Sequence, residues 1–244
     1  MHVAKTAMRV HNKPIMPIPK LLNVVRCTRV LFALMTLAAS VSSHAANSDA
    51  SPCAKVDAGY AIDDSVRGSF GSSNHVNACI DVLRAHEDEP RRLRIFVDGK
   101  RVLSNDAVAM GPGDGGTMGD PFQPLEVKGG SLVVQNAGGG GPLRWIETWH
   151  LTIRDGQWVI AGWDEDSWDS HSAADGGGDF HTSVNALTGE IHASYDPPDG
   201  DKTAKRSTHH VCKLPPEWRS PAIVQVAAIR ARSWHCDAKL AKPL

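Results

Sequence analysis

Apolar and polar residues alternate along several short segments of the chain, and residues that favour turns separate these segments. The alternating or densely apolar segments are residues 79–85, 93–97, 100–104, 125–128, 131–136, 143–154, 157–163, 180–185 and 190–195. Alternation with a period of two is typical of β-strands, and the Asp-Gly pairs at 98–99 and 155–156 are strong signals for hairpin turns. The pattern therefore predicts an all-β domain of antiparallel hairpins in a propeller-like or sandwich arrangement.

The longest predicted hairpin joins residues 143–154 to residues 157–163 and is rich in tryptophan. With Asp155-Gly156 as a two-residue turn, Trp149 lies opposite Gly162. One face then carries the apolar residues Trp145, Trp149, Leu151, Ile153, Trp158 and Ile160. The opposite face carries Thr148, His150, Thr152, Val159 and Trp163. We expect the first face to be buried and the second to be partly exposed.

Glycine-rich and acidic segments separate the predicted strands. Residues 105–121 and 138–141 predict loops, and a long loop in a small domain is often functional. Residues 164–179 are rich in Asp and predict a solvated loop. Residues 221–232 are too densely apolar for periodicity to separate a strand from a helix.

Residues 1–45 have the features of a cleavable signal peptide. They contain basic residues and no acidic residue, an apolar run at 30–39, and small residues at 43 and 45, where a signal peptidase reads. The apolar run is shorter than a membrane span, so we expect export to the periplasm and no span in the mature chain, with an uncleaved anchor as the alternative. The rest is expected to comprise an irregular arm at 46–77 and a single β domain at 78–244.

Removal of this leader makes the protein acidic. The whole chain has 26 basic and 27 acidic residues, and loss of the six leader cations leaves 20 against 27, a net charge of −7. Nucleic acid binding depends on clustered Lys and Arg, so the charge argues against a nucleic acid partner. It favours a basic protein partner, which an acidic surface attracts over a distance.

Four cysteines follow the leader: Cys53, Cys79, Cys212 and Cys236. An even number in an oxidising compartment predicts two disulfides, and the local pairing joins Cys53 to Cys79 and Cys212 to Cys236. Each bond would fix one end of the chain. The alternative is a metal site that uses the second cysteine pair with His235 and the His209-His210 pair, but no C-x-x-C spacing supports it.

Few residues offer chemistry beyond packing. Glu147, with the carboxylates at 164–169, is the candidate acid of a hydrolase, although glycosidases need two carboxylates at a defined separation in one cleft. The acidic segment 164–179 is a candidate calcium loop, but it lacks the glycine and the closing glutamate of an EF-hand. Trp163 and Trp168 could form a platform for sugar rings. The residues alone therefore predict no catalytic set, metal or cofactor, and leave glycan binding open.

Two stretches resemble a family of exported bacterial proteins: GDPFQPLEVKGGSLVVQNAGGGGPLRW at 119–145 and ETWHLTIRDGQWVIAGWDEDSWD at 147–169. In that family a GDPF segment precedes a strand, a glycine-containing loop and a strand that begins Trp-Arg-Trp. The matching residues are Gly119, Asp120, Pro121 and Phe122 for the GDPF segment, Gly138 and Gly139 for the loop, and Arg144 and Trp145 for the strand. Characterised members are periplasmic immunity proteins of antibacterial type IV secretion systems.

The resemblance implies a β-propeller-like inhibitor of a lysozyme-like peptidoglycan hydrolase, whose glycine loop enters the cleft of the enzyme. The contact residues that it implies are Ala137, Gly138, Gly139, Gly140, Gly141, Pro142, Arg144 and Trp145. Such a protein needs no catalytic residue, and its acidic charge suits a basic cell-wall hydrolase or another periplasmic protein as partner. A glycan-binding or envelope-structural module with exposed tryptophans, and an uncharacterised hydrolase, are the alternatives.

Overall fold

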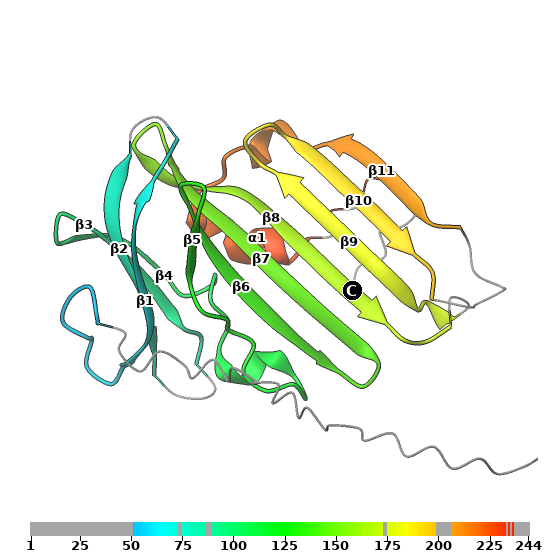
Figure 1. Cartoon of the computed structure of the whole chain (residues 1–244), viewed down its shortest axis with the longest axis horizontal. Helices are drawn as coiled ribbons and strands as arrows, with labels where there is room; N and C mark the ends of the chain where they lie inside the picture. Colours follow the sequence, from blue (N-terminus) through cyan, green and yellow to red (C-terminus); the bar gives the residue numbers. More distant parts are fainter. Residues whose placement is uncertain are drawn as a thin grey trace, which may run out of the picture. The chain divides into compact units, whose positions relative to one another are not determined.

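The computed structural model describes residues 51–72, 75–85, 89–172, 175–198, 206–232, 234 and 236. All of them belong to one compact unit, His44–Leu244. Their strands form two open antiparallel sheets that pack as a sandwich, as Figure 1 shows. The all-β prediction is therefore confirmed in its sandwich form. The predicted signal peptide at 1–45 lies outside the described residues.

The smaller sheet has the order β1-β2-β3-β4. Its strands are β1 (Ala61–Phe70), β2 (Val76–Arg84), β3 (Arg92–Val97) and β4 (Lys100–Asn105). The prediction of an irregular arm at 46–77 is wrong for β1, which pairs with β2 along its whole length. Its sequence AIDDSVRGSF has few apolar residues because β1 is an edge strand, and of these Phe70 alone is fully buried.

The larger sheet has the order β11-β10-β9-β8-β7-β6-β5. Its strands are β5 (Glu126–Lys128), β6 (Ser131–Gly140), β7 (Leu143–Arg154), β8 (Gln157–Asp169), β9 (Gly178–Asn185), β10 (Glu190–Asp196) and β11 (Thr208–Lys213). Two predicted loops are wrong in part, because the glycines at 138–140 end β6 and the acidic residues at 164–169 end β8. Both segments pair with β7, so the β6–β7–β8 strands extend further than their apolar residues indicate.

Short helical segments follow β4 and β11. They are η1 (Pro112–Gly115), η3 (Pro216–Trp218), η4 (Ile223–Gln225) and α1 (Val226–Arg230). The apolar segment 221–232 is thus helical at 223–230, while Ala222 forms a β-bridge with Val159. In the view of Figure 1, α1 lies behind the larger sheet. In the part of the chain that the structure describes, no helix has both the length and the apolar character to cross a membrane.

A β-bulge in the β7–β8 hairpin changes the register that the turn predicts. Leu151 lies opposite Ile160, but His150 lies opposite Gly162, so Ala161 is the extra residue in β8. Trp149 therefore lies opposite Trp163, not Gly162, and both indoles are fully buried. The predicted exposure of Trp163, and with it a sugar platform built on this residue, is wrong.

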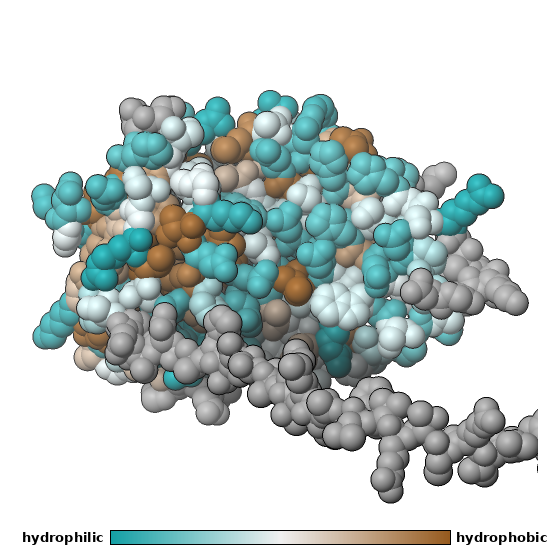
Figure 2. Space-filling model, in the orientation of Figure 1, coloured by the Kyte–Doolittle hydropathy of each residue, from teal (hydrophilic) through white to brown (hydrophobic). Residues whose placement is uncertain are grey.

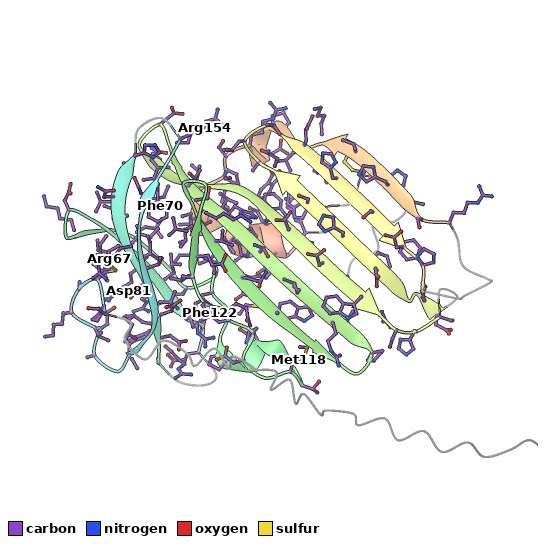
Figure 3. The ribbon with its side chains drawn as sticks, viewed as in Figure 1. Arg67, Phe70, Asp81, Met118, Phe122 and Arg154 are labelled. Atoms are coloured by element: carbon purple, nitrogen blue, oxygen red, sulfur yellow. A yellow bond between two sulfur atoms is a disulfide. The ribbon has the colours of Figure 1, made fainter. Side chains whose placement is uncertain are left out.

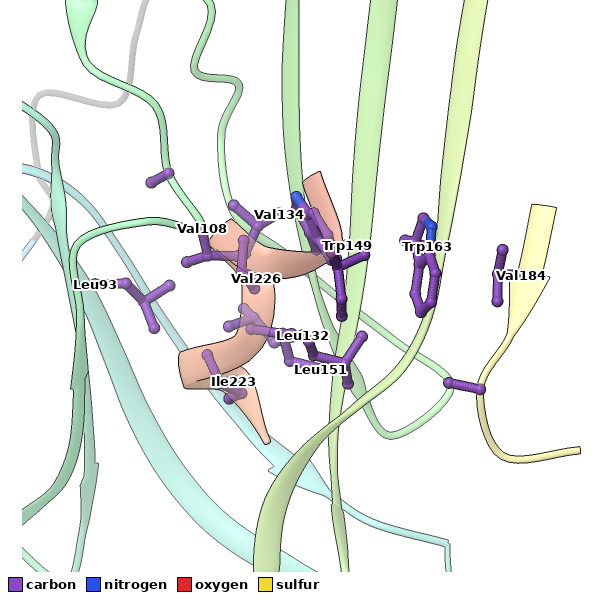
Figure 4. Close-up of a cluster of buried hydrophobic side chains, with 14 of the residues drawn as sticks. Leu93, Val108, Leu132, Val134, Trp149, Leu151, Trp163, Val184, Ile223 and Val226 are labelled. Carbon is purple, nitrogen blue, oxygen red and sulfur yellow. The ribbon is translucent and has the colours of Figure 1, made fainter. Parts of the chain in front are cut away.

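The core lies between the two sheets and continues under α1. The smaller sheet contributes Ile80, Leu93 and Ile95, and the larger sheet contributes Leu132, Val134, Trp149, Leu151, Trp163 and Val184. Ile223, Val226 and Ile229 cover the rest of this face, as Figure 4 shows for the first two. The rings of Trp163 and Trp234 meet edge to face, with centroids 5.1 Å apart.

Both disulfides have the predicted local pairing. Cys53 bonds to Cys79 with Cα atoms 5.6 Å apart, and Cys212 bonds to Cys236 with Cα atoms 5.4 Å apart. The first fixes the chain before β1 to β2, and the second fixes the chain after α1 to β11. The alternative metal site on the second cysteine pair is wrong because both sulfurs are bonded to each other; His235, its proposed third ligand, lies outside the described residues.

Trp149→Ala should lower the free energy of unfolding by about 3–5 kcal/mol, because it leaves a large cavity between the sheets. Trp168→Ala, which truncates an exposed indole at the end of β8, should change stability by no more than about 0.5 kcal/mol. Urea unfolding followed by circular dichroism measures both. Equal losses in the two variants would contradict the described core.

Candidate functional site: the end of the β6–β7 hairpin

The predicted contact residues 137–145 lie at the end of the β6–β7 hairpin. Ala137 to Gly140 pair with Ile146 to Leu143, so only Gly141 and Pro142 form the turn. Gly138 and Gly139 are buried, whereas Gly141 and Leu143 are exposed. The prediction of a loop at 138–141 is therefore wrong for residues 138–140, which belong to a paired strand, and holds only for Gly141.

The buried glycines allow the segment around η1 to lie directly on β6. A Cβ atom on Gly138 would collide with the indole of Trp145 and approach the carbonyl oxygen of Gly115 to 2.9 Å. Gly139 forms a parallel bridge with Gly116, and its carbonyl oxygen accepts a hydrogen bond of 3.2 Å from the hydroxyl of Thr117. The glycines at 138 and 139 thus permit close packing of one backbone on another.

The GDPF segment holds a buried arginine. The Arg91 guanidinium is almost fully buried and donates to Asp63 and Asp120 over 2.5 Å each. It also donates to the carbonyl oxygen of Met110 over 2.6 Å and lies 4.8 Å from the ring centroid of Phe122.

The GDPF segment is also bonded to β6, because the carbonyl oxygen of Pro121 accepts a hydrogen bond from the backbone of Ala137. Asp120, Pro121 and Phe122 therefore fix the loop to the sheet, and Gly119 provides a turn at a φ of 85°.

Three large apolar side chains are exposed at this end of the sheet. Met118 is 53% exposed, Leu143 41% and Trp168 39%. Met118 follows Thr117, which contacts the hairpin, and Figure 3 shows it at the same end of the molecule. Trp168 lies opposite Arg144, whose guanidinium donates to two carbonyl oxygens of the hairpin over 2.8 Å. We call Met118, Gly141, Pro142, Leu143 and Trp168 the tip surface.

An open pocket of about 400 Å³ lies next to the tip surface. It is lined by Ile146, Asp166, Ser167, Trp168, Asp179, Phe180, His181, Ser194 and Asp196. Its rim includes the partly exposed indole of Trp168. The ring of Phe180 lies on the opposite face of the sheet, where it packs against Tyr195 with centroids 4.8 Å apart. We call this the acidic pocket, because three of its lining residues are Asp.

In the pocket and beside it, the outer face of the larger sheet carries carboxylates paired with imidazoles. The His150 Nε2 atom lies 2.9 Å from Asp164, and the His181 Nδ1 atom lies 2.6 Å from Asp166. Burial opposes ionisation of Asp164, but hydrogen bonds from His150 and Ser183 hold its pKa below the ordinary value. Figure 2 shows this face, on which hydrophilic residues predominate.

On the inner face, Glu147 is held in an ion pair. Both of its oxygens accept hydrogen bonds of 2.7 Å from Arg230 of α1, and Oε2 also accepts one from Asn136. Glu165 lies opposite Glu147. Burial, and then repulsion from Glu147, raises the pKa of Glu165 to about 7, although the positive charge of Arg230 acts to lower it. Glu147 lines neither of the two described pockets, and this geometry suits attachment of α1 to the sheet.

The other described pocket lies on the smaller sheet and has a volume of about 540 Å³. Its lining includes Arg67, Asn77, Phe96 and the Cys53–Cys79 disulfide. None of the residues predicted to contact a partner lies in it. Within the described ranges, no group of three or more His, Cys, Asp or Glu side chains is arranged to hold a metal ion.

Sequence reasoning found the tip but missed the acidic pocket. Gly141, Pro142, Arg144 and Trp168 were identifiable from the chain, whereas Asp179 and its neighbours on β9 and β10 reach the pocket only through strand pairing.

No protein-family model, no curated protein and no solved structure matches this chain. The geometry of the strand ends therefore provides the basis for the function proposed below.

Gly138→Ala should destabilise the protein by about 1–3 kcal/mol, because its methyl group would displace Trp145 or the segment around Gly115. Gly140→Ala is the matched control: the nearest atom to its Cβ, on Thr117, would lie at an ordinary 3.7 Å. Thermal unfolding compares the two variants. A Gly138→Ala protein as stable as the control would show that close packing at this glycine is not required.

Glu165 should make the protein lose stability as the pH rises from about 4.5 to about 7, since the folded state keeps this proton to a higher pH than the unfolded chain. Glu165→Gln should flatten that slope and raise the free energy of unfolding at pH 8. Glu126→Gln, at the exposed start of β5, should leave the slope unchanged. Urea titrations at pH values from 4 to 8 measure these slopes, and an unaltered slope in Glu165→Gln would contradict the assignment.

Proposed function

We propose that this chain is an exported binding protein that inhibits a basic, lysozyme-like peptidoglycan hydrolase, as an inhibitor or immunity protein does, and that the tip surface contacts the enzyme. The observation that carries the proposal is the group of exposed apolar side chains at the hairpin end. Met118, Leu143 and Trp168 come from three separate segments and lie at one end of the larger sheet, with Leu143 and Trp168 on opposite faces of it.

The tip is held in place before any partner binds. Strand pairing continues to Gly140 and Leu143, and the Pro142 carbonyl oxygen accepts a hydrogen bond from the backbone of Ser170 on the other side. The Arg144 guanidinium also holds the turn, because it donates hydrogen bonds to the carbonyl oxygens of Gly141 and Leu143. A preorganised contact surface loses little conformational entropy on binding, which favours affinity.

Charge supports a basic partner. The chain after the predicted leader has a net charge of −7, and the carboxylates of Asp166, Asp179 and Asp196 lie beside the tip surface. Complementary charge speeds association and suppresses wrong partners. Enzymes that degrade the anionic cell wall tend to be basic, which is consistent with the resemblance to immunity proteins.

Glycan binding is the second candidate, and Trp168 is the observation that favours it. With Trp163 buried, Trp168 is the exposed indole of the predicted pair, and it stands beside carboxylates that can accept hydrogen bonds from sugar hydroxyls. Titration of the purified protein with muropeptides alone separates the two functions. An indole fluorescence change with sugar would support glycan binding, and a response only to a hydrolase would support inhibition.

In a lysis assay with a panel of basic peptidoglycan hydrolases, the protein should slow the clearing of cell walls by at least one enzyme. Leu143→Asp should weaken that inhibition about tenfold or more, because it places a charge in the apolar centre of the contact. Val211→Asp makes the same change on β11 at a side chain that is 54% exposed, and should inhibit like the wild type. Undiminished lysis by every enzyme of the panel would count against the proposal, as would equal inhibition by the two variants.

A further inference from the structure

We infer that the acidic pocket binds an arginine or lysine side chain projecting from the basic protein partner, so that contact combines an ionic anchor with the apolar tip surface. The inference deepens the proposed function and rests on it for the nature of the partner. The chemistry of the pocket itself can be tested without any hydrolase.

Strand pairing places the pocket beside the tip. Arg144, Trp168, Asp179 and Asp196 are successive neighbours across β7, β8, β9 and β10. The next row inward is formed by Ile146, Asp166, His181 and Ser194 on the same strands. The two rows surround a depression of about 400 Å³, which is within the range of sites that hold small ligands or single side chains.

The pocket keeps a negative charge at neutral pH. Three carboxylates line it, and His181 is the one imidazole among the lining residues. The His181 Nδ1 atom lies 2.6 Å from Asp166, so acidic groups outnumber basic ones in the pocket, three Asp against one His. The nearest guanidinium in the row, that of Arg144, is turned toward the hairpin carbonyl oxygens of Gly141 and Leu143.

An aromatic ring beside carboxylates favours a cationic side chain. Trp168 is 39% exposed, lines the pocket and lies on the same face of the sheet as Asp179 and Asp196. A guanidinium or ammonium group is stabilised by a cation–π contact with the face of an indole and by charge-assisted hydrogen bonds to Asp oxygens. An anionic or purely apolar side chain can form neither interaction. Arginine suits the site best, since its planar group can stack on Trp168 and bond to a carboxylate together.

The test is titration of the full-length mature protein with a hexa-arginine peptide, observed through the indole N–H resonance of Trp168 and by calorimetry. Trp168→Phe assigns the resonance. The wild type should bind the peptide and shift this resonance, more weakly at high salt. Asp179→Asn/Asp196→Asn should reduce the affinity about tenfold or more, as removal of two paired charges predicts. Asp155→Asn, at a turn carboxylate 95% exposed at the far end of the hairpin, should bind like the wild type.

Two results would overturn the inference. One is equal affinity of hexa-arginine for the double variant and for Asp155→Asn. This result would show that the peptide is attracted by the overall negative charge of the protein and not by the pocket. The other is a shift of the Trp168 resonance by chitotriose and not by the peptide, which would assign the pocket to a sugar. Failure of the lysis assay with successful peptide binding would reject the hydrolase target and leave the cation pocket standing.

Discussion

The buried pair of Trp149 and Trp163 determines which side chains of β8 face the core and which face solvent. Their rings lie 5.9 Å apart, and both occupy the core because one extra residue in β8, Ala161, shifts the register beyond Leu151. Without this bulge the alternation of β8 would be reversed, and Asp164, Asp166 and Trp168 would face the interior. With it, the carboxylates and the exposed indole face outward. The packing of two indoles thus decides which side chains are available to a partner.

Ion pairs with at least one buried partner then attach the irregular segments to the sheets. Arg91 holds the loop before β5, and Arg94 joins Asp81 to the segment before β1, where it donates to the carbonyl oxygen of Lys55. Arg230 joins α1 to Glu147 in the same way. Removal of one partner from such a pair leaves an uncompensated charge, so each pair fixes the position of its segment strongly even where it adds little net stability.

The sequence predicted the features that follow from local patterns. The Asp155-Gly156 turn, the alternating strands of the core and the disulfide pairing all depend on nearby residues, and all are confirmed. The bulge at Ala161 has no sequence signal, because alanine fits a regular strand as well as a bulge. The glycines at 138 and 139 were predicted as a loop, since glycine is common in turns as well as where backbones approach closely. The acidic pocket was not predictable, because its residues meet only after β9 and β10 pair with the β7–β8 hairpin.

The order of the disulfides along the chain has a consequence for oxidative folding. Each bond joins cysteines that follow one another, with separations of 26 and 24 residues, and neither loop contains a cysteine of the other. If the chain is exported as proposed, with its amino terminus first, Cys53 and Cys79 reach the oxidising compartment before Cys212. Joining these four cysteines in order of appearance would then give the native bonds without reshuffling.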